Sequence, residues 1–210
     1  MDRLEDEISP FVEEIAYHEA GHAVAAFLLI DAKFESIKID TIENYGIVNV
    51  DDGSERGKKK KKANTNINIP EITTRIIILC SGDVAEFLYT GHKYEHDSSD
   101  YAYSFKLLSR FCPKEKIPSY IEEIWNIALH LLQLPQNWFA IERVVGCLER
   151  AYTEPQDWNG SEFTYDFEYD EENRELDGDE LRKIIKEALE LYSKLQKREK
   201  VYYREPTSLF

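Results

Sequence analysis

Hydrophobic residues recur at helical spacing through most of the chain, beginning with the segment from about residue 10 to residue 30. Two neighbouring apolar stripes run along this segment, so a helix here is apolar on most sides and belongs in a protein core. Pro10 suits the first helical position, and Glu13 and Glu14 suit the first turns, where the helix dipole favours negative charge. The pattern predicts a mainly α fold, with further helices at residues 70–91, 99–111, 118–132, 135–152 and 181–200.

Two short runs depart from the helical spacing. β-branched residues dominate residues 34–40 and 45–50, and Ile37 and Ile39 fall on one face of the first run. The turn between the runs predicts a small β-hairpin. Such a hairpin can hold the backbone of a peptide by strand addition, or it can simply cover one end of the core, and the pattern does not choose between these roles.

Two polar segments interrupt the predicted elements. Residues 51–66 include five consecutive lysines, 58–62, whose mutual repulsion predicts a solvated loop. Residues 153–174 are acidic and aromatic, and over 163–170 aromatic and polar residues alternate with period two, which predicts a strand. We expect this second segment to be a surface insertion or a contact for a partner.

Composition narrows the class of protein. A length of 210 residues and a hydrophobic content of 42% predict a single globular domain, 1–210. The net charge of −15 argues against general binding of nucleic acid. No apolar stretch reaches membrane-spanning length. Three cysteines without CxxC spacing (Cys80, Cys112 and Cys147) predict buried, reduced thiols in a cytoplasmic protein.

The candidate chemistry lies in the first helix, where residues 18–22 read His-Glu-Ala-Gly-His. Residues four apart share one helix face, with Cβ atoms roughly 6 Å apart, so His18 and His22 can bind one Zn²⁺ through neutral imidazoles. Glu19 lies beside them, close enough to take a proton from a water on the metal. Zinc lowers the pKa of that water to about 7, which makes hydroxide available at neutral pH.

A catalytic zinc ion needs a third protein ligand, and spacing alone does not identify it. The candidates between the second helix and the start of the third are Glu86, His92, Glu95, His96, Asp97 and Asp100. The run Asp97-Ser-Ser-Asp100 also has a purely structural interpretation, with Asp97 as the N-cap of a helix and Asp100 in its first turn.

Three segments resemble the FtsH family of ATP-dependent zinc metalloproteases. Ala-Tyr-His-Glu-Ala-Gly-His-Ala, residues 16–23, is similar to the zinc-binding segment of that family. Ser81-Gly-Asp-Val-Ala-Glu86 resembles its "GG-x-A-A-E" helix but departs from it at two positions, Ser81 and Val84. Residues 175–182 resemble the "T-L-x-G-x-E-I" that opens its last helix. The resemblance implies a mostly helical peptidase domain with a small β-hairpin near the zinc site.

The resemblance also implies roles for particular residues. The third ligand in FtsH-like proteases is an Asp in the first turn of the helix after the loop, and Asp100 matches that place. Glu86 is then expected to orient a ligand histidine through its free ring N–H, and no cofactor besides Zn²⁺ is expected. Ser81 and Gly82, small residues inside an apolar helix, predict a close approach to the zinc-binding helix.

Residues 1–210 contain no Walker motif, which separates the chain from the ATPase part of the FtsH-like proteins. The sequence therefore predicts a zinc peptidase that cleaves unfolded or flexible polypeptides without its own ATPase, unless a separate ATPase serves it. The family's assembly into hexamers makes a homo-oligomer a further expectation. The alternative is a zinc-containing protein-interaction module with little hydrolytic activity, although such a module has no need of Glu19.

Overall fold

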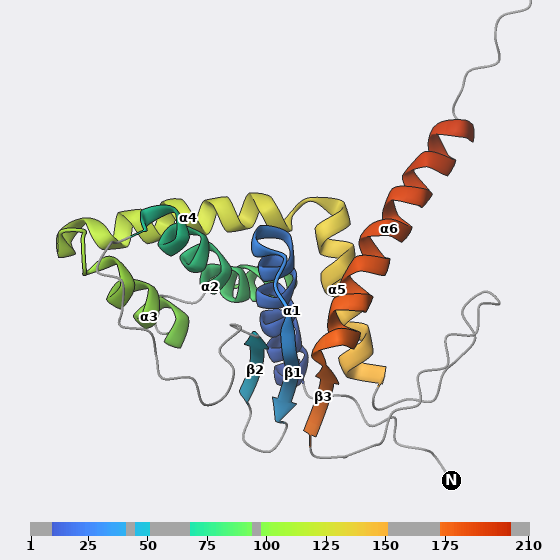
Figure 1. Cartoon of the computed structure of the whole chain (residues 1–210), viewed down its shortest axis with the longest axis horizontal. Helices are drawn as coiled ribbons and strands as arrows, with labels where there is room; N and C mark the ends of the chain where they lie inside the picture. The colour runs from blue at the N-terminus through green and yellow to red at the C-terminus, as the bar shows by residue number, and fades with distance from the viewer. Residues whose placement is uncertain (1–9, 41–44, 51–67, 94–97, 151–172, 203–210) are drawn as a thin grey trace, which may run out of the picture.

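The computed structural model describes residues 10–40, 45–50, 68–93, 98–150 and 173–202, in which the chain forms six α-helices and a three-stranded sheet (Figure 1). The mainly helical prediction is confirmed. The helices are α1 (Pro10–Ile30), α2 (Ile69–Thr90), α3 (Ser99–Leu108), α4 (Ile117–Leu132), α5 (Pro135–Arg150) and α6 (Gly178–Tyr202), with a 3-10 turn at Lys114–Lys116. The strands are β1 (Phe34–Asp40), β2 (Tyr45–Val50) and β3 (Asn173–Asp177).

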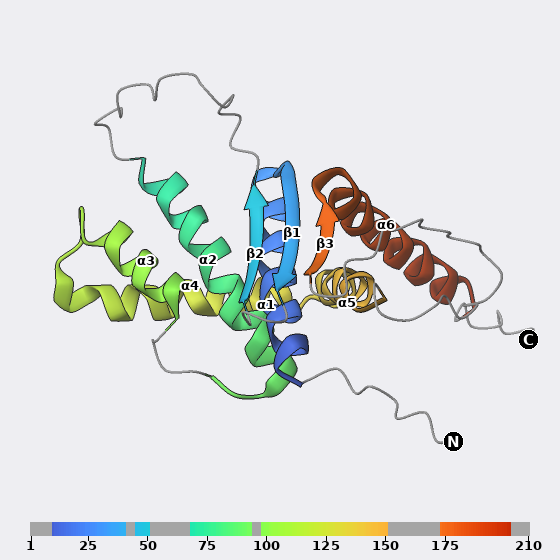
Figure 2. The same ribbon diagram turned by 90° about the horizontal axis from the view of Figure 1, so that it is seen from below.

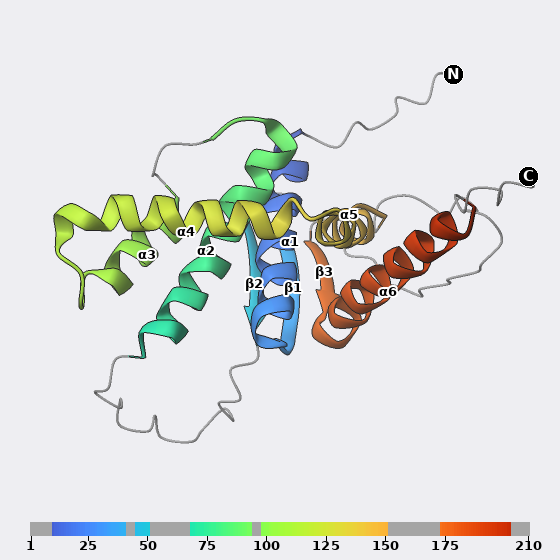
Figure 3. The ribbon, with the colours of Figure 1, turned by 90° about the horizontal axis from the view of Figure 1, so that it is seen from above.

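Helix α1 lies at the centre of the molecule, between α2 on one side and α5 on the other (Figure 1). Its small residues are fully buried, including Ala20, Ala23 and Val24, which lets neighbouring backbones approach closely. Seen from above, α4 crosses α2 (Figure 3). Seen from below, the three strands lie side by side along α1, and α6 follows β3 (Figure 2). The central position of α1 matches its lack of a polar face.

The contact between α1 and α2 depends on glycine. A Cβ atom at Gly21 of α1 would overlap the carbonyl oxygen of Ser81 and come 2.6 Å from the Cβ of Ala85, both on α2. The expectation that small residues bring α2 close to the helix carrying His18 and His22 is therefore confirmed. The predicted end of α2 is also confirmed, because Gly91 adopts the left-handed conformation, at φ 75°, and its N–H bonds to the carbonyl of Phe87.

The predicted hairpin is present as the antiparallel pair β1 and β2, and Ile37 and Ile39 are both fully buried. The sequence did not predict β3, which pairs with the other edge of β1 and aligns Leu176 with Ile37. Only one apolar residue, Leu176, lies in this strand, too few for a recognisable alternation, so its pairing with β1 defines it. The strand expected over 163–170, the lysine-rich loop 51–66 and the insertion up to residue 172 lie outside the described residues.

The start of α6 is fixed by a cap and a close contact. Asp177 Oδ1 accepts hydrogen bonds from the backbone N–H groups of Asp179, at 2.9 Å, and Glu180, at 3.0 Å, so Asp177 caps the helix. The next residue, Gly178, lies directly against the start of β1, where a Cβ atom would overlap the carbonyl oxygen of Phe34. The glycine therefore lets the last helix begin beside the sheet.

The cysteines only partly match their prediction. Cys80 and Cys147 are buried as expected, whereas Cys112, in the turn after α3, is only half-buried. No disulfide joins any two of these cysteines, all of which lie in the described part of the chain. Burial raises the pKa of the Cys80 thiol to about 12, with further contributions from nearby carboxylates, so this thiol stays protonated and unreactive at neutral pH.

No helix in the described part of the chain combines the length and the apolar character needed to cross a membrane.

Candidate metal centre

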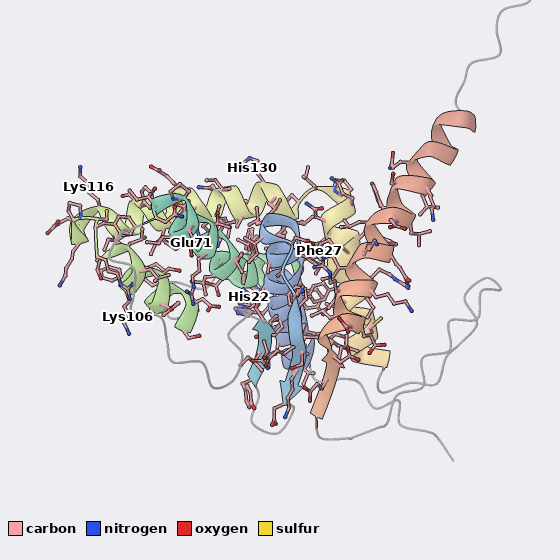
Figure 4. All side chains as sticks on the ribbon, in the orientation of Figure 1. His22, Phe27, Glu71, Lys106, Lys116 and His130 are labelled. Atoms are coloured by element: carbon pink, nitrogen blue, oxygen red, sulfur yellow. The ribbon has the colours of Figure 1, made fainter. Side chains whose placement is uncertain are left out.

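His18 and His22 project from one face of α1, as their spacing predicts. Their rings meet edge to face with centroids 4.7 Å apart, and their Nε2 atoms lie 3.1 Å from each other. The labelled His22 lies on the α2 side of α1, and Phe27 lies on the opposite side, toward α5 and α6 (Figure 4). The side chains of His18 and His22 are 19% and 13% exposed, so the pair is largely shielded from bulk water.

The third member of the cluster comes from α3. Asp100, in the first turn of that helix, places its Oδ2 atom 2.9 Å from His22 Nε2 and 3.2 Å from His18 Nε2. Three potential metal-binding atoms thus converge from α1 and α3, although His22 and Asp100 are 78 residues apart in the sequence. The sequence-predicted ligand set His18, His22 and Asp100 is brought together in one place.

The second nitrogen of each ring has a partner of its own. His22 Nδ1 lies 2.8 Å from the carbonyl oxygen of Ile78. Because a carbonyl can only accept, Nδ1 carries the proton, which leaves the Nε2 atom of neutral His22 with a lone pair. His18 Nδ1 lies 3.1 Å from Glu86 Oε2, and donation to that carboxylate leaves Nε2 of neutral His18 unprotonated as well. This is the contact expected of Glu86: its carboxylate lies at Nδ1, the ring nitrogen of His18 that does not face Asp100.

The donor set fits a zinc ion. Two imidazole nitrogens and one carboxylate oxygen are common zinc ligands, and a fourth position left open is typical of catalytic sites. In a tetrahedral site with bonds of about 2.0–2.2 Å, ligand atoms lie about 3.3–3.6 Å apart, slightly more than the spacing of 2.9–3.2 Å found here. Three acceptor atoms at such distances repel one another unless a proton or a metal cation lies among them.

Gly82 leaves open space beside the two histidine rings. A Cβ atom at this position of α2 would overlap Nε2 of His22 and come 2.6 Å from Nε2 of His18. Both are the nitrogens that face Asp100. The hydrogen side chain of Gly82 therefore keeps the metal-facing side of both rings clear.

The electrostatics of the cluster favour positive charge. Burial lowers the pKa of His18, but its contacts with Asp100 and Glu86 outweigh that effect and raise the pKa to about 10. For Asp100, burial raises the pKa, and the hydrogen bonds to His18 and His22 outweigh it and hold the pKa well below its usual range. In the metal-free protein, a proton on His18 supplies part of the positive charge that a bound metal ion would supply among these side chains.

Glu19 lies next to the two histidines, and its residue is only 6% exposed. Burial raises the pKa of its carboxyl, while the neighbouring His22 and His18 and a hydrogen bond with the backbone of Val48 oppose the rise. Gly46, also on β2, packs on the same side chain, because a Cβ there would overlap Glu19 Cγ. Strand β2 thus holds Glu19 beside the metal-binding atoms.

Among the described candidates, Glu86 contacts Nδ1 of His18 and not the Nε2 atom that faces Asp100. His92 is exposed just beyond the end of α2, and Glu95, His96 and Asp97 lie outside the described residues. The N-cap of α3 is Ser98, whose Oγ accepts from the N–H of Tyr101 at 3.0 Å.

Among the described residues around the cluster, the sequence analysis assigned no role to five: Gly46, Val48, Ile78, Asp83 and Ser98. The only signal was a glycine in a strand, which often marks a close backbone approach, and it could have identified Gly46.

No protein-family model matches this sequence, and a search of curated proteins finds no match either. The likeness to FtsH-like proteases therefore stays a prediction that depends on the quoted motifs.

Proposed function

We propose that this chain is a zinc-dependent peptidase that hydrolyses peptide bonds of unfolded or flexible polypeptides. The supporting observation is the convergence of His18, His22 and Asp100, with ligand atoms 2.9–3.2 Å apart and the other ring nitrogens already engaged. Glu19 beside this cluster argues for catalysis, because a site that only stabilises the fold needs no further buried carboxylate.

Zinc bound by these three residues would lower the pKa of water and polarise the scissile carbonyl. Glu19 is the general base in this proposal: its carboxylate accepts the proton of the attacking water and later delivers it to the nitrogen of the leaving amine. Burial, which raises the pKa of Glu19, makes the carboxylate a better proton acceptor near neutral pH. Glu86 keeps the His18 ring in the tautomer that leaves Nε2 unprotonated.

The edge strand β2 is the proposed binding surface for the substrate backbone. The sheet order is β2-β1-β3, so β2 lies at an edge, and Val48 and Gly46 border Glu19. An extended peptide that adds to this edge would pass the general base. Such a site accepts flexible chains, because a folded protein does not present an extended backbone to it.

The test combines metal content with cleavage of a disordered peptide. Glu19→Gln keeps the size of the side chain but removes the proton acceptor, so we expect hydrolysis to fall about 10²- to 10⁴-fold while zinc stays near one equivalent. Glu123→Gln, at an exposed position of α4, is the matched control and should cleave like the natural protein. His130→Gln, also on α4, should retain zinc, whereas His22→Gln should lose it.

Two results would count against the proposal. Unchanged cleavage by Glu19→Gln would remove this residue from the mechanism. A natural protein that binds zinc but does not cut any disordered peptide would favour the interaction module instead.

A further inference from the structure

Asp83 lies on α2 between the zinc-binding helix and the start of α3. Its Oδ1 atom is 3.8 Å from Nδ1 of His18, and its Oδ2 atom accepts a hydrogen bond of 2.9 Å from the hydroxyl of Ser98. The side chain of Asp83 is 31% exposed, so both contacts are partly shielded from water. One carboxylate thus faces a histidine of the cluster and the residue that begins the helix carrying Asp100.

Ser98 has two roles in this arrangement. It donates its hydroxyl proton to Asp83, and the same oxygen accepts the backbone N–H of Tyr101 at 3.0 Å, which caps α3. Asp100 is two residues farther along, in the first turn. A continuous path of hydrogen bonds and backbone therefore runs from Asp83 through Ser98 to the carboxylate that faces His18 and His22.

Helix α3 needs such a fixed point. It has only ten residues, and isolated helices of that length are marginal in water, so its position depends on its cap and its packing. Asp100 must keep Oδ2 within 2.9–3.2 Å of two nitrogens on another helix. A small shift of the first turn of α3 would move that oxygen out of reach.

We propose that Asp83 is a positioning residue that fixes the first turn of α3, through Ser98, so that Asp100 reaches the metal-binding nitrogens. This inference rests on the proposed metal centre. Asp83 also groups with His18 and Glu86 around the other ring nitrogen, but in the proposed site of His18, His22 and Asp100 it acts through Ser98 and is not a ligand. The atom of His18 that it faces is Nδ1, which already lies 3.1 Å from Glu86, whereas Nε2 faces Asp100.

An alternative role for Asp83 is purely electrostatic, as one more negative charge near His18. Asp83→Asn separates the two roles, because the amide oxygen can still accept from Ser98 but the charge is lost. Asp83→Ala removes both the acceptor and the charge. Ser98→Ala removes the link from the other end and leaves the charge of Asp83 in place.

The experiment measures the affinity of each variant for Zn²⁺ in a competition with a chromophoric chelator, and the visible spectrum of each variant with Co²⁺. We expect Asp83→Ala and Ser98→Ala each to weaken zinc binding about 10- to 100-fold, the range typical of residues that orient ligands, and to alter the Co²⁺ spectrum. Asp83→Asn should stay within a few-fold of the natural protein. Because the two residues act through one bond, the double alanine variant should lose no more than Ser98→Ala alone.

A second readout needs no metal. Amide exchange at Tyr101 in the metal-free protein should become faster in Asp83→Ala and in Ser98→Ala, because the cap loosens. Ser109→Ala, at the other end of α3, where the hydroxyl bonds only to the carbonyl of Lys106, is the matched control and should leave this amide and the zinc affinity unchanged.

The outcomes separate this inference from the proposed function. If the natural protein binds neither Zn²⁺ nor Co²⁺, the metal centre itself is wrong. If the natural protein binds zinc and Asp83→Ala lowers only the melting temperature, without a change in affinity or spectrum, the positioning role is overturned. An equal loss of affinity in Asp83→Asn and Asp83→Ala would assign the effect to charge and would also overturn it.

Discussion

Gly82 matters to the candidate metal centre through the side chain that it lacks. We predict that Gly82→Ala lowers zinc affinity at least tenfold, because the new methyl group would overlap the Nε2 atoms of His18 and His22. The control is Gly146→Ala on α5, where a Cβ would meet nothing within 4 Å. Helix propensity alone should make that control more stable by up to about 1 kcal/mol, without a change in zinc binding. Zinc titration and thermal unfolding of both variants provide the measurement, and equal zinc affinities would contradict the prediction.

The raised pKa of His18 makes metal binding depend on pH. The pKa in the metal-free protein is about 10, so His18 holds a proton at pH 7–9 that zinc must displace. We predict release of about one proton for each zinc bound and an affinity that rises about tenfold per pH unit in this range. Calorimetric titrations in buffers of different ionisation enthalpy measure the proton count. A count of zero at pH 8 would contradict the assigned protonation of His18.

The raised pKa of His18 also makes the stability of the metal-free protein depend on pH, but stability should fall with rising pH whereas zinc affinity should rise. The folded-state pKa of His18 lies above its ordinary value of 6.5, so the stabilisation is complete below pH 6.5 and is lost as the pH rises through about 10. High pH should therefore weaken the metal-free protein while it strengthens zinc binding. Unfolding curves at pH 7 and pH 10, with zinc and with a chelator, should show this contrast.

Among the individual elements, the helices were predictable because each is long enough for apolar residues to recur at helical spacing. The apolar character of α1 on most of its sides and the cap at Gly91 are local signals, and both are found. Strand β3 was missed because its five residues include only one apolar residue, too few to show an alternating pattern. The strand is defined by its pairing with β1, which joins residues about 140 apart in the sequence. The structural interpretation of residues 97–100 made Asp97 the N-cap of α3, but the N-cap is Ser98. Asp and Ser are both favoured at N-cap positions, so the sequence alone does not distinguish them.

The junction between β1 and α6 leads to a prediction at this scale. Gly178→Ala should destabilise the protein by about 1–3 kcal/mol or more, because a methyl group would overlap the carbonyl of Phe34 and force the helix away from the strand. Gly91→Ala is the comparison: its φ of 75° disfavours alanine by about 1–2 kcal/mol, but open space surrounds it. Denaturant unfolding measures both free energies. A smaller loss of unfolding free energy in Gly178→Ala than in Gly91→Ala would contradict the prediction, because it would show that the junction can shift to make room for the methyl group.

A further contact supports the same junction. Arg182, one turn into α6, donates to the carbonyl of Asp31 at 3.1 Å and pairs with the Asp31 carboxylate, while its guanidinium lies 5.0 Å from the centre of the Phe27 ring. Asp31 has a positive φ of 50°, an uncommon conformation that these contacts help to hold at the end of α1. The last helix thus secures both β1, which pairs with β2, and the end of the helix that bears the histidines.

At the scale of the whole molecule, the candidate site was predictable only where its parts are local. His18, Glu19 and His22 follow from one helix turn. Asp100 is 78 residues from His22, so spacing could not select it among several acidic residues and histidines, and the family resemblance was needed. Tertiary contacts bring Asp83, Ser98 and Gly46 to the site, and a single sequence does not reveal such contacts between distant residues.

The last prediction concerns the kind of substrate. Residues 1–210 contain no Walker motif, so we expect the purified chain to cleave disordered polypeptides without ATP and to leave stably folded proteins intact. With a stability of about 5–15 kcal/mol, a folded substrate exposes only a small fraction of open chains at any moment. A peptidase that waits for this fraction should cleave at a rate that follows the stability of the substrate.

The measurement compares one folded test protein with a series of its destabilised variants, each with and without ATP. Cleavage should rise about tenfold for every 1.4 kcal/mol of destabilisation, until opening is no longer limiting, and ATP should have no effect. Glu19→Gln serves as the inactive control for contaminating proteases. ATP-stimulated degradation of the stable protein by the purified chain would contradict the prediction, because it would require an energy-coupled unfolding step that a passive zinc site beside an edge strand does not provide.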